Sequence, residues 1–237
     1  MKKRTLLILI ALCMVVKTTV QSQSKAITTA TPFLLIAPDA RSGGMGDIGV
    51  ATSSDAFSMF HNPSKIAFNK NQISIGLNYT PWLRTLVDDI FVGGISYVNR
   101  FKENAAWAVD LKYFSLGSID LTDDIGDPIG TENPNEFVVS GAYSLKLSET
   151  FAMGVGLKYI RSNLKLGSLN VDLKAINSFA VDISGYYQSQ EENYGQFNGR
   201  YRLGFNIANI GPKVSYVPGK EDFIPTNLKL GGGFDFI

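Results

Sequence analysis

Apolar and polar residues alternate along most of the chain from Gln72 onward. Successive side chains of a β-strand point to opposite faces, so a period of two predicts strands with one apolar face and one polar face. We expect eight such strands, over residues 72–80, 89–99, 105–120, 135–147, 150–163, 174–188, 200–210 and 227–237. The pattern therefore predicts an all-β protein.

The two faces of these strands differ sharply in character. The third expected strand sets Leu111 against Lys112, and the fifth sets Leu157 against Lys158. This alternation fits a soluble sandwich, with one face in a core and one in water. It also fits a transmembrane barrel, whose apolar side chains face lipid and whose polar side chains face the lumen.

Three features favour the barrel. Many of the strands reach the roughly 9–11 residues that a tilted strand needs to cross a bilayer. Isolated Lys, Arg, Asp and Gly on the polar face suit a lumen. Tyr and Trp lie near strand ends, as interfacial aromatic girdles do: Tyr79, Trp82, Tyr97, Trp107, Tyr113 and Tyr159. We expect an antiparallel transmembrane β-barrel, in which arginine is costly at Leu111 or Leu157 and alanine is tolerated at Lys112 or Lys158.

The lengths of the connections alternate as well. Short connections are expected at 100–104 and 148–150, and long ones at 81–88, 122–134, 164–173 and 211–226. Short periplasmic turns and long external loops are typical of bacterial outer-membrane barrels. The connection over 188–198 departs from this alternation, because it is long on the expected periplasmic side.

Residues 25–70 break the strand pattern, and we expect them to form a plug packed against or inside the sheet. The segment is rich in glycine and has few long apolar runs. A short helix is expected over 55–60, capped by Ser53, Ser54 or Asp55 and stopped before Pro63, since the residue preceding a proline disfavours helical geometry. The residues that characterise the plug are Asp39, Arg41, Gly43, Gly44, Gly46, Asn62 and Pro63.

The plug also contains a match to G-x-G-x-x-G, at residues 44–49. A dinucleotide site needs a strand before this motif, a helix opening within it and an acidic residue about 20 positions later. Pro38 interrupts the approach, and no Asp or Glu lies between Ser64 and Lys70. We interpret these glycines as positions where the backbone turns tightly or packs closely.

Composition limits the possible chemistry. The 237 residues carry a net charge of +1, which gives no global field to attract nucleic acid. His61 is the one histidine and Cys13 the one cysteine, so neither a His-based metal cluster nor a Cys/His nucleophile pair can be built. His61 is expected to be a satisfied polar group at a helix end. The acidic loop with Asp123, Asp124, Asp127 and Glu132 does not have EF-hand spacing. We expect no enzyme activity, no metal and no cofactor.

The first 24 residues resemble a secretory signal peptide. A basic start, Met1 to Arg4, is followed by an apolar run over 5–16 that is too short to span a bilayer as a helix. Cys13 lies within this run, so the mature chain is expected to have no disulfide. We expect three segments, with 1–24 as signal peptide, 25–70 as plug and 71–237 as barrel strands. The barrel is expected to lie in the outer membrane, in contact with its lipid.

Several stretches carry a dense family resemblance. They include PFLLIAPDARSGGMGDIGVATSSDA in the plug, LNYTPWLRTLVDDI around the first long loop, PNEFVVSGAYSLKLSETFAMGVGLKYIRS over the fourth and fifth strands and PTNLKLGGGFDF at the end. The chain resembles the PorV family, outer-membrane components of the Bacteroidetes type IX secretion system, and more broadly the FadL-like barrels.

The resemblance implies a barrel without enzyme activity that works with a giant SprA-like translocon. It also implies that cargo is received by its folded C-terminal domain and passed to a surface attachment complex. FadL-like barrels have about fourteen strands, so we expect the eight strands here to be part of a larger barrel. The FadL-like relationship leaves a second function open, the transport of hydrophobic small molecules.

The long loops are unusually apolar for segments that face water. Exposed apolar side chains rimmed by charges often mark a binding surface, and aromatic residues often carry its energy. The alternative is that these loops fold over the barrel mouth and bury their own apolar side chains. The candidate partner-binding residues are Trp82, Leu83, Tyr216, Val217, Phe223 and Ile224.

Overall fold

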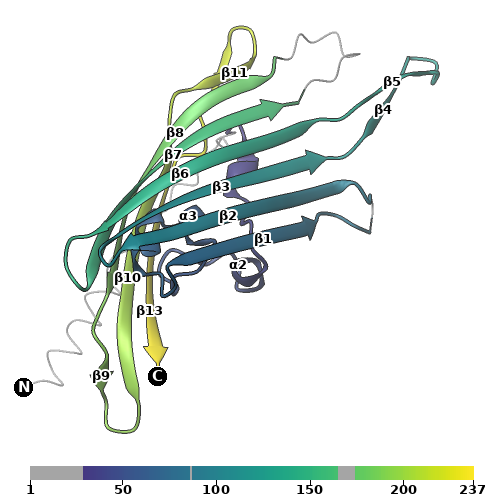
Figure 1. Ribbon diagram of the computed structural model, residues 1–237. Helices are drawn as coiled ribbons and strands as arrows, with labels where there is room; N and C mark the ends of the chain where they lie inside the picture. The colour runs from purple at the N-terminus through teal and green to yellow at the C-terminus, as the bar shows by residue number, and fades with distance from the viewer. Residues whose placement is uncertain (1–28, 86, 165–173) are drawn as a thin grey trace, which may run out of the picture.

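The computed structural model describes residues 29–85, 87–164 and 174–237, so the expected signal peptide lies outside the described residues. One large antiparallel sheet dominates the molecule (Figure 1). Its eight long strands follow one another in chain order. They are β1 (Ile73–Pro81), β2 (Ile90–Lys102), β3 (Ala105–Leu116), β6 (Asn135–Lys146), β7 (Phe151–Asn163), β8 (Ile176–Gln188), β10 (Asn198–Ile210) and β13 (Asn227–Phe236).

The expected antiparallel strands are confirmed, and their bounds differ by a few residues. The largest difference is in the third, where β3 ends at Leu116 because Gly117 adopts a φ of 79° and turns the chain. The following residues form a hairpin of β4 (Ile119–Thr122) and β5 (Pro128–Glu132). Other connections hold β9 (Glu192–Asn193), which pairs with β10, and a hairpin of β11 (Val214–Val217) and β12 (Lys220–Asp222).

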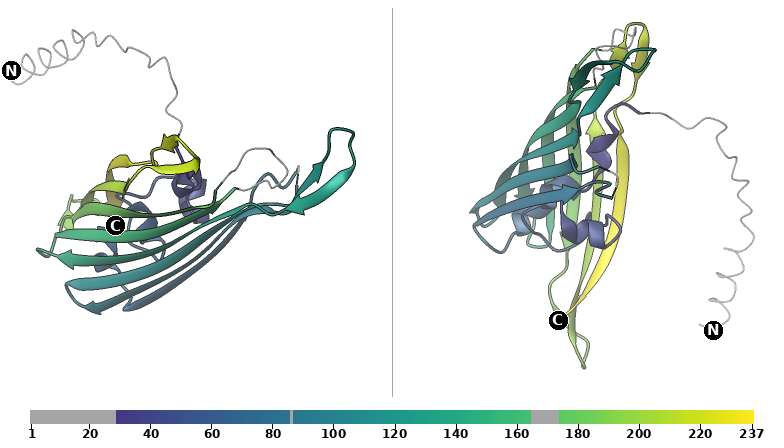
Figure 2. Two further views of the ribbon diagram at one scale, coloured as in Figure 1. Left: turned by 90° about the horizontal axis from the view of Figure 1, so that it is seen from above. Right: turned by 90° about the vertical axis from the view of Figure 1, so that its right-hand side faces the viewer.

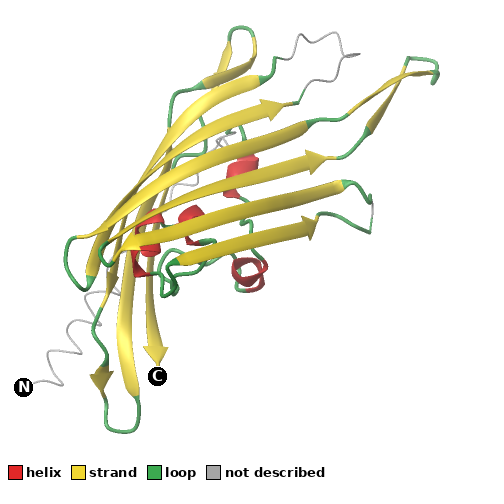
Figure 3. Ribbon diagram, viewed as in Figure 1, coloured by secondary structure: helices red, strands yellow, loops and turns green. Residues whose placement is uncertain are grey.

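The sheet curls around the segment expected to be the plug. Figures 2 and 3 show short helices on the concave side of the sheet. They are η1 (Pro32–Leu35), α2 (Ala40–Gly44), α3 (Ser58–His61) and η2 (Pro63–Phe68). Helix α3 begins later than expected because the Asp55 carboxylate accepts a hydrogen bond from the backbone N–H of Phe57 (3.0 Å), which favours a local turn.

The sheet is polar on its concave side and apolar on its convex side. On the convex face, 74% of Leu77 and 72% of Leu230 are exposed, whereas Asp182 and Asn206 on the concave face are fully buried. The face assignments made from the alternation are confirmed. None of the helices in the described residues is long and apolar enough to cross a membrane.

Two small apolar clusters join the plug to the concave face. The larger cluster contains Phe33 and Leu34 of η1, together with Val138 and Ile160 of the sheet. The second contains Met59, Ile66, Val98, Ala106, Ala108 and Ala142. Both clusters are small, so polar contacts must provide much of the fit between plug and sheet.

Candidate functional site

Asn62 connects α3, η2 and the sheet through one buried side chain. Its Nδ2 donates to the carbonyls of Val50 (2.9 Å) and Gly185 (3.1 Å), and its Oδ1 accepts from the backbone N–H of Ser64 (3.1 Å). Asn62 thereby caps η2, which Pro63 opens. The concave face of the sheet, called the wall below, completes the junction, because the Ser64 N–H also donates to the Ser184 hydroxyl of β8 (3.0 Å).

A second buried group lies at the start of α2. The Asp39 carboxylate caps this helix by accepting from the N–H of Ser42 (2.8 Å), and it lies 3.2 Å from Nε2 of His61. Burial alone would raise the pKa of Asp39, but the hydrogen bonds from His61 and Ser42 outweigh it and hold the pKa well below its usual range. Burial lowers the pKa of His61 despite the Asp39 contact. As expected, His61 is a buried polar group at the end of a short helix.

Lys65 holds the glycine-rich loop from inside the plug. Its Nζ donates to the carbonyl of Gly49 (2.7 Å) and lies 2.9 Å from the Thr52 hydroxyl. Burial lowers the pKa of Lys65 to about 8. Arg41 pairs with Asp55 at 2.8 Å on the exposed side. The loop is therefore fixed at both ends.

Glycines allow the plug backbone to approach the wall closely. A Cβ placed at Gly154 would lie 2.6 Å from the backbone N of Ser64, and one at Gly204 would lie 2.4 Å from the carbonyl of Val50. Within the G-x-G-x-x-G match, Gly46 has a φ of 75° and Gly49 packs against the His61 ring, as the interpretation of a tight turn requires. Open space surrounds Gly44, so close packing is not its role.

The lysines of the concave face are bound to specific partners. Lys158 forms an ion pair with the fully buried Asp182 (2.7 Å) and donates to Oδ1 of Asn209 (2.8 Å). Lys112 donates to the carbonyls of Phe33 and Ile36 at the end of η1, each at 2.9 Å. These contacts change the expectation that alanine is tolerated at both lysines, since a lost partner leaves a buried charge or carbonyls unpaired.

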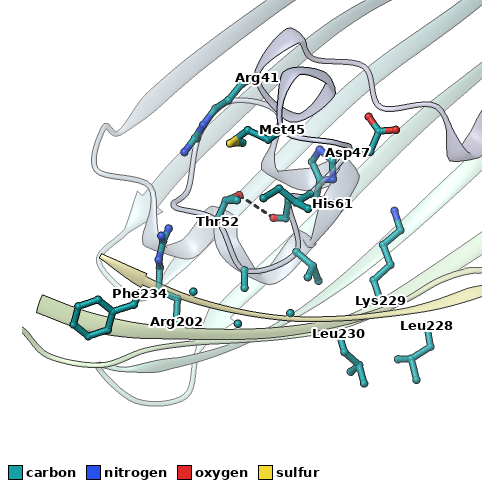
Figure 4. A pocket seen from close by; sticks show the side chains of 17 residues that line it. Arg41, Met45, Asp47, Thr52, His61, Arg202, Leu228, Lys229, Leu230 and Phe234 are labelled. Carbon is teal, nitrogen blue, oxygen red and sulfur yellow. Dashed lines mark hydrogen bonds between the residues drawn. The ribbon is translucent and has the colours of Figure 1, made fainter. Parts of the chain in front are cut away.

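A pocket of about 610 Å³ lies between the plug and the last two strands of the sheet (Figure 4). Figure 4 shows Lys229 pointing toward the plug, while Leu228 and Leu230 point to the other side of the strand. The remaining lining residues are Arg41, Met45, Asp47 to Thr52, His61, Arg202 and Gly231 to Phe234. The lining mixes apolar groups with several cationic side chains.

Aromatic side chains form two rows on the convex face. The row near the long loops contains Tyr79, Phe91, Tyr113, Phe137, Tyr159 and Phe179. Four pairs of neighbouring rings in this row have centroids 5.1 to 6.3 Å apart. The row near the short turns contains Tyr97, Trp107, Tyr143, Phe151, Tyr187, Tyr201 and Phe234. On β3, six residues separate Trp107 from Tyr113, or roughly 20 Å at about 3.4 Å per residue. Two such rows around an aliphatic band are typical of transmembrane barrels.

Among the residues that the structure describes, no three His, Cys, Asp or Glu side chains are grouped as they would be around a metal ion. Asp123 in the acidic β4–β5 hairpin instead accepts hydrogen bonds from the N–H groups of Ile125 (3.0 Å) and Asp127 (2.8 Å).

The comparisons with known proteins identify the family of the chain. A family model described as type IX secretion system protein PorV matches residues 19–237. The chain belongs to the PorV family. It is therefore a member of a family of secretion-system components. A search of curated proteins found no significant match.

The structure divides the candidate partner-binding residues of this PorV family member into two groups. Trp82, Leu83 and Phe223 are exposed at the end of the sheet that carries the long loops, and Val217 is half-buried there. Ile224 is buried in the larger apolar cluster, and Tyr216 packs against that cluster. The hydroxyls of Tyr216 and Ser162 lie 2.7 Å apart. The β11–β12 segment thus covers part of the concave side with its own residues.

Sequence reasoning missed the polar contacts that seat the plug. Ser144 donates to the carbonyl of Ser64 (2.9 Å), and Asn206 donates to the carbonyl of His61 (3.0 Å). Each partner lies 80 or more positions away in the chain. The available signal was their placement at polar positions of the alternation, which predicts a face but no partner.

Proposed function

We propose that this protein is an outer-membrane β-barrel component of the type IX secretion system that docks partners with its long-loop end rather than conducting solutes. Membership in the PorV family is the observation that carries the proposal. The plug on the concave side and the aliphatic band between two aromatic rows support it. The role is binding without catalysis.

The proposed partners are an SprA-like translocon, the folded C-terminal domains of secreted cargo and the surface attachment complex. The docking residues are proposed to be Trp82, Leu83 and Phe223, because they combine exposure with a large apolar surface. Lys213 lies over the ring of Phe223, 4.7 Å from its centroid, so a cationic side chain borders this residue.

Paired substitutions at the two ends of the sheet test this assignment. Trp82→Ala with Phe223→Ala should leave the barrel folded but weaken co-purification with the translocon and cargo, so that cargo accumulates in the periplasm. The matched control is Phe101→Ala with Leu147→Ala, which removes exposed apolar side chains from the short-turn end. Normal secretion and co-purification in the first variant, at wild-type barrel levels, would place the docking surface elsewhere.

The pocket beside β13 favours a second candidate function, the binding of a small hydrophobic or amphiphilic molecule. Its volume of about 610 Å³ falls in the range of small-molecule sites. Gly233→Leu would place a large side chain on the pocket wall, because a Cβ at Gly233 meets no atom closer than 3.6 Å. If the pocket binds such a molecule, mass spectrometry should find it with the native protein and not with this variant, whereas secretion should be unaffected if the two functions are separate.

A further inference from the structure

The hairpin between β8 and β10 carries a cluster of exposed rings at the short-turn end of the sheet. Tyr194 stacks on Phe197 with centroids 5.3 Å apart, and Phe197 lies 5.2 Å from Phe236 and 6.2 Å from Phe234. Tyr194 and Phe197 are each 39% exposed. Figure 1 shows the hairpin extending beyond the turns between β2 and β3 and between β6 and β7. From this extension alone, the hairpin would be expected to project into water.

The register of the sheet gives a different location. Trp107 on β3 pairs with Tyr143 on β6, which pairs with Val155 on β7. The ring on β7, Phe151, lies four residues further toward the short turns. Phe151 pairs with Tyr187 on β8, which pairs with Leu203 on β10.

The next ring on β10, Tyr201, lies two residues further in the same direction and pairs with Phe234 on β13. Relative to directly paired residues, the aromatic row therefore shifts six residues toward the short turns across the five strand pairs from β3 to β13. The row near the long loops shifts in the same direction. Phe137 on β6 pairs with Arg161 on β7, and the ring on β7, Tyr159, lies two residues closer to the short turns.

Strand tilt explains this drift. Strands of a transmembrane barrel tilt by about 35–45° from its axis, and neighbours lie about 4.8 Å apart. A plane perpendicular to the axis then crosses successive strands with an offset of roughly 3.4–4.8 Å, or about 1–1.4 residues per strand. The observed drift of six residues over five steps falls within that range.

We infer that the hairpin rings lie in the headgroup layer of the bilayer, as the continuation of the lower aromatic row, and that a lipid surface is their partner. This rests on the proposed membrane location of the sheet. Phe234 joins the hairpin to the row, since its ring contacts Tyr201 (5.1 Å) and Tyr194 (5.7 Å). The Tyr194 hydroxyl, which donates to Glu192 (3.2 Å), gives the cluster the polar end that suits an interface.

Site-specific labels in vesicles test the inference. With the signal segment removed, the chain has no cysteine, so Phe197→Cys and Tyr194→Cys each carry one environment-sensitive fluorophore. Val155→Cys, midway between the rows, is the control for lipid contact, and Asp124→Cys on the β4–β5 hairpin is the control for water. In phosphatidylethanolamine–phosphatidylglycerol vesicles, labels at Phe197 and Tyr194 should emit to the blue of the Asp124 label and resist iodide.

Depth-specific quenchers complete the test. Headgroup-labelled lipid should quench the hairpin labels more than chain-labelled lipid does, and the order should reverse for the Val155 label. If the hairpin labels behave like the Asp124 label while the Val155 label contacts lipid, the inference about the hairpin is wrong, but the membrane location of the sheet is not affected. A Val155 label in water would overturn the membrane location itself. Protection of the hairpin that appears only with added periplasmic proteins would identify a protein partner instead, and would also overturn the inference.

Discussion

The amide of Asn62 connects three segments of the molecule, since it bonds to the loop at Val50, the helix start at Ser64 and the wall at Gly185. Alanine at this position would leave buried donors and acceptors without partners, at about 1–3 kcal/mol for each. Asn62→Ala should lower the denaturant midpoint at which the folded form is lost on heat-modifiability gels. The exposed Asn133→Ala should leave that midpoint unchanged, and an equal loss in both variants would contradict the role given to Asn62.

Two glycines in neighbouring strands provide a sharper comparison at the same scale. A Cβ at Gly154 would meet the plug backbone, whereas one at Gly141 would meet nothing within 4 Å. Gly154→Ala should therefore cost about 1–3 kcal/mol through overpacking, with Gly141→Ala near neutral. Protease sensitivity of residues 29–70 would measure the difference. If both variants are cut alike, the close approach of plug and wall is not tight.

At the scale of elements, the plug is held by hydrogen bonds that would have to break together before it could move. The Ser64–Ser184 contact allows this to be tested with the pair Ser64→Cys and Ser184→Cys. An oxidised pair should retain normal association with secretion partners, because the proposed function uses the plug as a fixed core. Loss of association on oxidation, restored by reductant and absent from either single variant, would show that the plug moves.

The strands and their faces could be predicted from the sequence because both depend on local alternation. Leu111 and Lys112 were placed on opposite faces from their positions alone. The partners of Lys112 could not be predicted, since Phe33 and Ile36 approach it only through the fold. Burial of Ile224 depends in the same way on Phe33 and Val138, which are remote in sequence.

At the scale of the whole molecule, the apolar surface is on the outside and the polar groups are within. Val155 is 55% exposed and lies four residues from both Phe151 and Tyr159, midway between the aromatic rows. Val155→Arg should cost roughly 2–4 kcal/mol if this face contacts lipid. The measurement is the free energy of unfolding in vesicles. Ile125→Arg, at an exposed hairpin tip, is the control, and equal costs at the two positions would contradict the membrane assignment.

The hydrogen bonds between plug and wall also constrain the order of folding. They join residues as far apart as His61 and Asn206, 145 positions along the chain. Helices of four or five residues such as α3 and α2 are not stable alone in water, so the segment has no structure to adopt before the later strands exist. Closing contacts of this sequence separation is slow. If the protein is exported to the proposed outer-membrane location, Phe33 and Leu34 would therefore stay uncovered until β6 to β8 had assembled, and this is the interval in which a periplasmic chaperone would be needed most.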